Sequence, residues 1–197
     1  MDEAALFRLL DELAEFGRAN DVRETERSRR LLNITPEAGR LLSILVRVLG
    51  ARDILELGTS NGYSTIWLAW AASATGGHVT TVDQAPHKIA MARENLARAG
   101  LDGRVTIREG RILDVLRSLA GPVDFILLDA DRPSYTGYLD PLLRLLRPGG
   151  LLATDNVVSH GSEVTEFVAR LRADPALETV TPPVGSGVEL TYKRKHG

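Results

Sequence analysis

Short apolar segments alternate with helical segments from residue 53 onward, and this alternation constrains the fold more than any other feature of the sequence. Strands are expected at residues 53–57, 78–83, 104–108, 123–129 and 151–155, with helices at residues 66–72, 86–99, 113–119, 139–146 and 162–172. This βαβα order predicts a parallel sheet with helices on both faces. Two last strands, at residues 177–180 and 188–194, have so short a link that they must be antiparallel.

The first fifty residues precede this pattern and predict two helices. Leucines recur at helical spacing over residues 2–17, and Gly17 can end that helix. Residues 21–30 (DVRETERSRR) are expected to be a solvated, densely charged connector. A second helix begins at Pro36, with Thr35 as its cap, and ends at Gly50. We expect a single domain over residues 1–197, with N-terminal helices at 1–50 and an α/β core at 51–197.

Composition excludes several classes of protein. The chain has no cysteine, so disulfides, thiolate metal ligands and a cysteine nucleophile are excluded. The formal net charge of -2 gives no basic field for a nucleic-acid partner. No apolar run is long enough to cross a membrane, and the acidic start does not resemble a signal peptide. We therefore expect a cytoplasmic protein with neither a nucleic-acid nor a membrane partner.

The loop after the first expected strand, residues 56–64 (ELGTSNGYS), indicates a small-molecule site. Gly58 and Gly62 allow a sharp turn and a close approach of backbone to ligand. Glu56 lies within an apolar run and needs a polar partner if it is buried. The loop lacks the G-x-G-x-x-G order that holds a pyrophosphate at a helix terminus, which disfavours NAD(P) and favours a cofactor without phosphates.

Acidic residues end several of the parallel strands and should gather at one edge of the sheet. Glu56, Asp83 and Asp129 end the first, second and fourth strands, and Asp155 with Asn156 ends the fifth. Asp83 is placed to accept hydrogen bonds from ribose hydroxyls. Each acid alone could equally be a solvated loop residue or a helix cap.

These residues resemble a known family, the cation-dependent S-adenosylmethionine O-methyltransferases that include catechol and caffeoyl-CoA O-methyltransferases. The resemblance covers about residues 30–195 and implies a Rossmann-like methyltransferase fold: a mostly parallel seven-stranded sheet with an antiparallel C-terminal strand. The motifs that carry it are residues 33–37 (NITPE), 56–64 (ELGTSNGYS), 82–83 (VD), 109–110 (EG), 128–131 (LDAD), 149–150 (GG), 155–156 (DN) and 187–188 (GV).

The resemblance also implies roles for individual residues. The residues expected at the S-adenosylmethionine site are Ile34, Thr35, Glu56, Gly58, Ser60, Gly62, Ser64, Asp83, Arg111, Ile112 and Asp129. The implied metal ligands are Asp129, Asp155 and Asn156. Two carboxylates and an amide oxygen suit a hard cation, Mg²⁺ first and Ca²⁺ or Mn²⁺ as alternatives.

Two positions depart from the family pattern. Arg132 stands where the relatives have a lysine that is thought to accept the hydroxyl proton, and arginine stays protonated in proteins. Arg132 could still stabilise a phenolate or bind a substrate carboxylate, while His160 is a candidate for the base. Ser186 replaces an aspartate that the relatives tend to have before the glycine. The catalytic residues expected are Asp129, Arg132 and His160.

The function expected is methyl transfer from S-adenosylmethionine to an oxygen of a small hydroxylated, catechol-like acceptor held by a divalent cation. The alternatives are an NAD(P)-dependent oxidoreductase and a non-catalytic S-adenosylmethionine-binding protein. Trp67 and Trp70 lie at i, i+3 spacing and are expected to pack in the core or at a dimer interface. Members of the family are commonly homodimers, so a homodimer is expected.

Overall fold

A computed structural model describes residues 2–195 and contains one seven-stranded sheet. The strand order is β3-β2-β1-β4-β5-β7-β6. The strands are β1 (Asp53–Leu57), β2 (His78–Asp83), β3 (Val105–Glu109), β4 (Val123–Leu128), β5 (Leu146–Thr154), β6 (Leu177–Val180) and β7 (Glu189–Lys193). Only β7 among the described strands runs antiparallel to its neighbours β5 and β6. The fold expected from the sequence is therefore confirmed.

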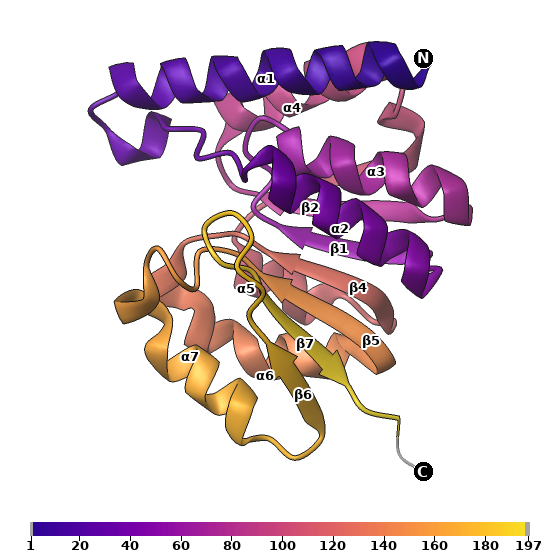
Figure 1. Ribbon diagram of the computed structural model, residues 1–197, viewed down its shortest axis with the longest axis vertical. Helices are drawn as coiled ribbons and strands as arrows, with labels where there is room; N and C mark the ends of the chain where they lie inside the picture. The colour runs from indigo at the N-terminus through magenta and orange to yellow at the C-terminus, as the bar shows by residue number, and fades with distance from the viewer. Residues whose placement is uncertain (1, 196–197) are drawn as a thin grey trace.

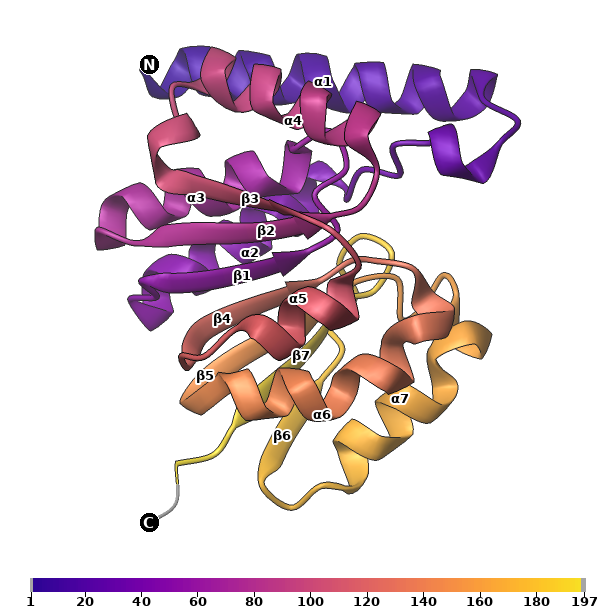
Figure 2. The same cartoon turned by 180° about the vertical axis from the view of Figure 1, so that it is seen from behind.

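Helices cover both faces of the sheet, and each face has its own apolar core (Figure 1). Alternate residues of β1 divide between them, because Ile54 packs on one face and Leu55 on the other. One face carries α1 (Glu3–Arg23), α2 (Pro36–Leu49), α3 (Tyr63–Thr75) and α4 (Pro86–Ala99). The other carries α5 (Ile112–Ser118), α6 (Tyr135–Leu145) and α7 (Gly161–Ala173). From behind, β3 forms the outer edge of the sheet (Figure 2).

The chain order reverses at β1, which lies between β2 and β4. In open α/β sheets the crevice at such a reversal, outside the carboxyl ends of the strands, is where ligands bind. Three short 3₁₀ segments, η1 (Arg27–Arg29), η2 (Asp102–Arg104) and η3 (Arg132–Ser134), complete the described elements. No helix within residues 2–195 has the length and apolar character needed to cross a membrane.

The first helix is longer than the sequence indicated. Gly17 does not end it, since α1 continues to Arg23 and takes in the start of the charged segment. A side chain at Gly17 would collide with the amide of Asn33 on the chain that returns beneath α1. The glycine is thus needed for close packing, not for a helix stop.

Two further boundaries were wrong. The strand expected at 151–155 begins earlier, because β5 starts at Leu146 and runs through the segment 148–150 (PGG) that was expected to precede it. Gly150 lies against the carbonyl oxygen of Asp124 on β4, where a side chain would not fit. The α6 helix begins at Tyr135, earlier than expected, and contains Pro141.

Of the two roles expected for the tryptophans, the core or a dimer interface, the structure shows packing within the chain. Trp67 is buried, and the Phe7 ring of α1 lies 5.7 Å from Trp67 and 5.2 Å from Trp70, centroid to centroid. The guanidinium of Arg47 lies 3.7 Å above the ring of Trp70. This face of α3 is therefore covered by the protein's own N-terminal helices.

Candidate active site

A cavity of about 920 Å³ lies at the carboxyl ends of β1, β2 and β4, where the chain order reverses. Its wall includes the loop after β1, the loop after β2, the loop after β4 and the segment between α1 and α2. The predicted site residues that line it are Ile34, Gly58, Ser60, Ser64, Asp83, Arg111, Ile112, Asp129, Arg132, Asn156 and His160. Together with residues after β3 and after β5, segments from six separate parts of the sequence thus form one site.

The loop after β1 touches the loop after β4. A side chain at Gly58, whose φ is +108°, would collide with the backbone carbonyl of Asp129. Ser60, at φ 46°, donates its backbone N–H to Asp83 Oδ2 over 2.8 Å, and Ala85 N–H donates to Asp83 Oδ1 over 2.9 Å. These bonds fix the Asp83 carboxylate at the cavity wall.

Glu56 lies behind this wall. Its side chain is fully buried and accepts hydrogen bonds from the hydroxyls of Ser64 (2.6 Å), Thr65 (2.5 Å) and Thr81 (2.6 Å). Burial raises the pKa of Glu56 from its ordinary value of 4.5 to about 7, although the three hydroxyls act to lower it. The sequence led us to expect Glu56 in the cavity wall, but Glu56 does not line the cavity. It is connected to the cavity through Ser64, which is a lining residue and donates a hydrogen bond to Glu56.

Asp129 and Asp155 form a buried acidic pair joined by Asn156. The side-chain amide of Asn156 donates to Asp129 Oδ1 over 3.0 Å and to Asp155 Oδ2 over 3.1 Å. Asp155 is 3% exposed, and its Oδ1 has no hydrogen-bond partner among the described residues. Burial, followed by the charge of Asp155, raises the pKa of Asp129 well above its usual range. Burial also raises the pKa of Asp155.

This set of groups fits a hard cation. The described residues contain no group of three or more His, Cys, Asp or Glu side chains that could hold a metal. The site that the resemblance implied has instead two carboxylates and one amide. The nitrogen of the Asn156 side-chain amide lies within hydrogen-bonding distance of both carboxylates, so the amide oxygen would face a cation there once the amide is turned over, and one buried carboxylate oxygen has no partner among the described residues. Oxygen sets of this kind suit Mg²⁺ or Ca²⁺.

Arg132 borders the acidic pair and is held from α7. Its side chain is 4% exposed, and its Nε and Nη2 donate to Glu163 over 3.1 and 3.4 Å. The charge of Arg132 opposes the rise in the pKa values of Asp129 and Asp155. The hydrogen bond from Arg132 in turn lowers the pKa of Glu163.

His160 lies on the same side of the cavity, at the start of α7. Its Nδ1 is 2.8 Å from the hydroxyl of Ser159. The backbone N–H groups of Val158 and Ser159 both donate to the carbonyl of Ser186, over 3.2 and 3.0 Å. The backbone carbonyl of Ser186 thus supports the loop that carries Asn156 and His160.

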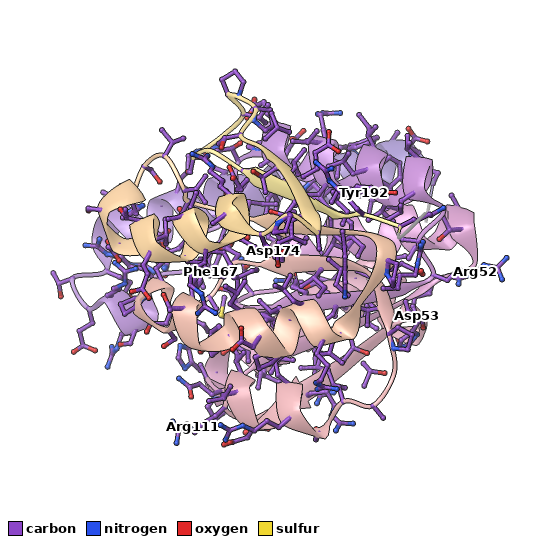
Figure 3. All side chains as sticks on the ribbon, turned by 90° about the horizontal axis from the view of Figure 1, so that it is seen from below. Arg52, Asp53, Arg111, Phe167, Asp174 and Tyr192 are labelled. Atoms are coloured by element: carbon purple, nitrogen blue, oxygen red, sulfur yellow. The ribbon has the colours of Figure 1, made fainter. Side chains whose placement is uncertain are left out.

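Other predicted residues lie at or behind the rim. Thr35 caps α2 by accepting the Ala38 N–H over 3.2 Å, and Gly62 precedes α3 at φ 85°. Neither lines the cavity, and Asp155 does not line it either. Arg111 lies beside α5, on the opposite side of the molecule from Arg52 and Asp53 at the start of β1 (Figure 3). Arg111 therefore lies toward the carboxyl ends of the strands.

The sequence left several lining residues unassigned. They are Arg27, Ser28, Arg30, Leu31, Leu32, Asn33, Thr59, Asn61, Val82, Gln84, Ala85, Lys88, Leu113, Ala130, Asp131, Pro133, Ser134, Gly137 and Tyr138. Lys88 carried a usable signal, since it falls in the first turn of the helix that follows Asp83. Arg27, Ser28 and Arg30 had none, because the charged segment 21–30 showed no motif, whereas Asn33 lies within the motif 33–37. Buried Tyr135 was also missed: its hydroxyl accepts the Ala130 N–H over 3.2 Å and so supports the loop after Asp129.

A doubly wound sheet with a large cavity at its reversal point defines a ligand-binding α/β protein of the Rossmann-like class. Within that class the chain belongs to the O-methyltransferase family, whose model matches residues 7–194.

Individual relatives agree with this assignment. A catechol O-methyltransferase from Niastella koreensis is 43% identical over 139 residues, which are 68% of this chain and 62% of the relative. A catechol O-methyltransferase from Mycobacterium tuberculosis is 38% identical over 149 residues, 75% of this chain and 66% of the relative. The chain thus spans less than two thirds of the length of these two relatives.

A solved structure extends the likeness over nearly the whole chain. An O-methyltransferase from Bacillus cereus, crystallised in complex with SAH, has a TM-score of 0.81 and 30% identity, covering 95% of this chain and 91% of that one. The fold that the sequence resemblance implied is that of the solved relative.

Proposed function

We propose that the protein transfers the methyl group of S-adenosylmethionine to a hydroxyl oxygen of a small, catechol-like acceptor that is held with the help of a divalent cation. The observation that carries this proposal is the buried pair Asp129 and Asp155, joined by Asn156, on the loops that border the cavity of an O-methyltransferase-family chain.

The cofactor would occupy the part of the cavity bordered by Gly58, Ser60 and Asp83. Asp83 is held by two backbone amides and can accept hydrogen bonds from ribose hydroxyls. The tight contact of Gly58 with the Asp129 loop brings the cofactor side next to the acidic pair. The SAH complex of the Bacillus cereus relative supports this placement.

The acceptor would bind beside Asn156, Arg132 and His160. Asp129, Asp155 and Asn156 are the residues that would hold a divalent cation, which when bound lowers the pKa of a coordinated hydroxyl. Asp129 also borders the cofactor loop, so its position sets the distance between acceptor and methyl donor. Holding the two reactants in line supplies much of the rate in a reaction of this kind.

The proton of the acceptor hydroxyl needs an acceptor other than Arg132. A guanidinium remains charged and can only donate hydrogen bonds. We assign Arg132 the role of stabilising the developing oxyanion, since its charge lies beside the acidic pair. His160 lines the same side of the cavity and is the group of this chain proposed to accept the proton.

The test is an assay of methyl transfer with labelled S-adenosylmethionine and a panel of catechols, with Mg²⁺ and with a chelator. We expect methylated catechol to form with Mg²⁺ and not to form when the chelator is present. Calorimetric titration with S-adenosylhomocysteine and with NADH distinguishes a methyltransferase from the alternative oxidoreductase. Binding of NADH without binding of S-adenosylhomocysteine would overturn the proposal.

One observation favours a second candidate, a non-catalytic S-adenosylmethionine-binding protein. Arg132 occupies the position of the family's lysine and is engaged by Glu163. If the protein binds the cofactor but methylates no member of the panel, with Mg²⁺ present, this second candidate replaces the first.

We also propose a homodimer. The tryptophan face of α3 is covered by α1, so a partner would need another surface. Ile44 and Val48, one turn apart on α2, are 55% and 82% exposed. Sedimentation velocity tests the proposal, and a monomer at micromolar concentration would contradict it.

A further inference from the structure

The segment that joins α1 to α2 crosses the cofactor side of the cavity. All five of its residues from 30 to 34, here called the 30–34 strap, line the cavity. In Figure 1 the chain leaves η1, turns back beneath α1 and reaches the start of α2. The strap has no regular secondary structure, so its position depends on side chains from elsewhere in the protein.

Asp21 of α1 fastens the strap on one side. Its Oδ1 accepts the backbone N–H of Leu31 over 2.6 Å, and its Oδ2 accepts that of Leu32 over 2.8 Å. Asn20 supports this carboxylate, since its amide donates both to Asp21 Oδ1 (3.0 Å) and to the carbonyl of Arg29 (3.1 Å). Hydrogen bonds from two amides to one charged carboxylate are among the stronger ones in proteins.

Lys88 of α4 fastens the strap on the other side. Its ammonium donates to the carbonyl of Arg30 over 2.7 Å, and the hydroxyl of Ser60 donates to the carbonyl of Leu31 over 2.8 Å. Burial lowers the pKa of Lys88, whereas the charges of Asp83, Asp21 and Asp129 oppose that change. A partly buried ammonium among three acids has little freedom to move away.

The strap also holds a strained residue. Leu32 has φ 52°, in the left-handed region that side chains other than glycine rarely adopt, and its side chain is 46% exposed. Such a conformation persists only where surrounding contacts impose it. Asp21 accepts the N–H groups of Leu31 and Leu32, and Lys88 donates to the carbonyl of Arg30. On the other side of Leu32, the side-chain amide of Asn33 donates to the carbonyl of Leu13 over 3.2 Å. Together these contacts hold Leu32 in that conformation.

We propose that Asp21 and Lys88 are positioning residues for the cofactor: they fasten the 30–34 strap across the cofactor side of the cavity and thereby set how long S-adenosylmethionine remains bound. The inference rests on the proposed function, because it needs the cofactor to bind in this cavity. Asp21 does not line the cavity, so it acts through the strap, whereas Lys88 lines it. If the strap opens more often, the binding-competent population falls and the apparent affinity falls with it.

The decisive variant is Asp21→Asn, which keeps the shape of the side chain but replaces an acceptor with a donor opposite one of the two N–H groups. Asp11→Asn, an exposed position on the same helix, is the matched control. The measurements are the affinity and dissociation rate of S-adenosylhomocysteine, and hydrogen exchange of the strap amides. We expect affinity to fall about tenfold in Asp21→Asn, through faster dissociation, and kcat at saturating S-adenosylmethionine to stay within about twofold.

A purely structural role for Asp21 would change the melting temperature without this separation of affinity from kcat. The expected exchange pattern is faster exchange at Leu31 and Leu32 in Asp21→Asn and slower exchange there when wild type binds S-adenosylhomocysteine. If Asp21→Asn does not fold, Lys88→Met tests the other fastening and should also speed dissociation.

The outcomes separate the two proposals. Equal affinity and dissociation rate in folded Asp21→Asn, Lys88→Met and wild type would overturn the role of the strap while leaving the methyltransferase proposal standing. A wild-type protein that binds S-adenosylhomocysteine tightly, releases it faster in Asp21→Asn and methylates no acceptor would support the strap and overturn the transferase. A wild type that binds no S-adenosylhomocysteine would overturn both.

Discussion

The cofactor side of the cavity satisfies its acids with donors from the chain, whereas the acceptor side sets two acids against each other. Glu56 accepts three hydroxyl hydrogen bonds, and Asp83 accepts two backbone N–H bonds. Asp129 and Asp155 share the single amide of Asn156, and Asp155 Oδ1 has no partner among the described residues. Both regions are formed by loops at the same edge of one sheet.

This difference indicates a division of labour. On the cofactor side, buried hydrogen bonds hold the loops in place before a ligand arrives, which reduces the free-energy cost of ordering them on binding. On the acceptor side, burial has raised the pKa values of two carboxyls whose charge the nearby Arg132 only partly offsets. Under the proposed function, a bound cation would supply the positive charge that offsets this pair of carboxyls.

The largest effect is expected from Asp155→Ala. Loss of this carboxylate should lower methyl transfer at least about a thousandfold, equivalent to about 4 kcal/mol, because a proposed cation ligand is removed. The affinity for S-adenosylhomocysteine should stay within about twofold, because Asp155 lies outside the cofactor side. Rate assays and calorimetry measure the two quantities, with Asp140→Ala on the exposed face of α6 as the control. Unchanged turnover would remove Asp155 from the metal assignment.

The next largest effect is expected at the contact between the two regions. Gly58→Ala places a methyl group against the backbone carbonyl of Asp129, which cannot move aside as a side chain could. We expect the free energy of unfolding to fall by about 3 kcal/mol. Urea denaturation measures it, and Gly121→Ala, with open space around the glycine, is the control. Equal losses in both variants would mean that the two loops are not in firm contact.

A pH-dependent effect of smaller size is expected at Glu56. Because its pKa is raised to about 7, the folded state keeps this proton while the unfolded state releases it near 4.5. The contribution of Glu56 to the free energy of unfolding is therefore fully present below about pH 4.5 and is lost as the pH rises through about 7. Glu56→Gln should gain stability relative to wild type, by about 2.5 kcal/mol between about pH 5 and about pH 8.

Denaturation at a series of pH values measures this gain, and Glu166→Gln on the exposed face of α7 is the control. A pH-independent difference between Glu56→Gln and wild type would mean that Glu56 titrates near its ordinary pKa. It would also sharpen the contrast between the regions, since Glu56 would then be a charged group fully stabilised by hydroxyls.

Local patterns predicted most of the fold, because they are set by nearby residues. The β-branched strand 78–83 and the helix from Pro36 to Gly50 have the boundaries the sequence indicated. Gly17 could not be read in this way, since its role depends on Asn33 returning beneath α1. A glycine needed for packing and a glycine that ends a helix look the same in the sequence.

The candidate site was predictable to a similar extent. Acids at strand ends follow from topology, so the meeting of Asp129, Asp155 and Asn156 could be expected. The fastening of the strap could not be predicted, because Asp21 and Lys88 bond to residues ten and 58 positions away. The place of Lys88 after Asp83 indicates a cavity residue but not its bond to the strap. Such contacts depend on how α1 and α4 pack, which is decided by the whole core.

The smallest effect is expected from Arg132→Lys, which tests whether the acceptor side needs the charge of this residue or its shape. Lysine keeps the positive charge beside Asp129 and Asp155 but loses the forked pair of bonds to Glu163. If the role is electrostatic, kcat should stay within about threefold of wild type, less than about 0.7 kcal/mol, or rise. Arg132→Met, which removes the charge, should lower kcat more than Arg132→Lys does. Folded Lys and Met variants that are equally inactive would show that the forked geometry, rather than the charge, is what the acceptor side requires.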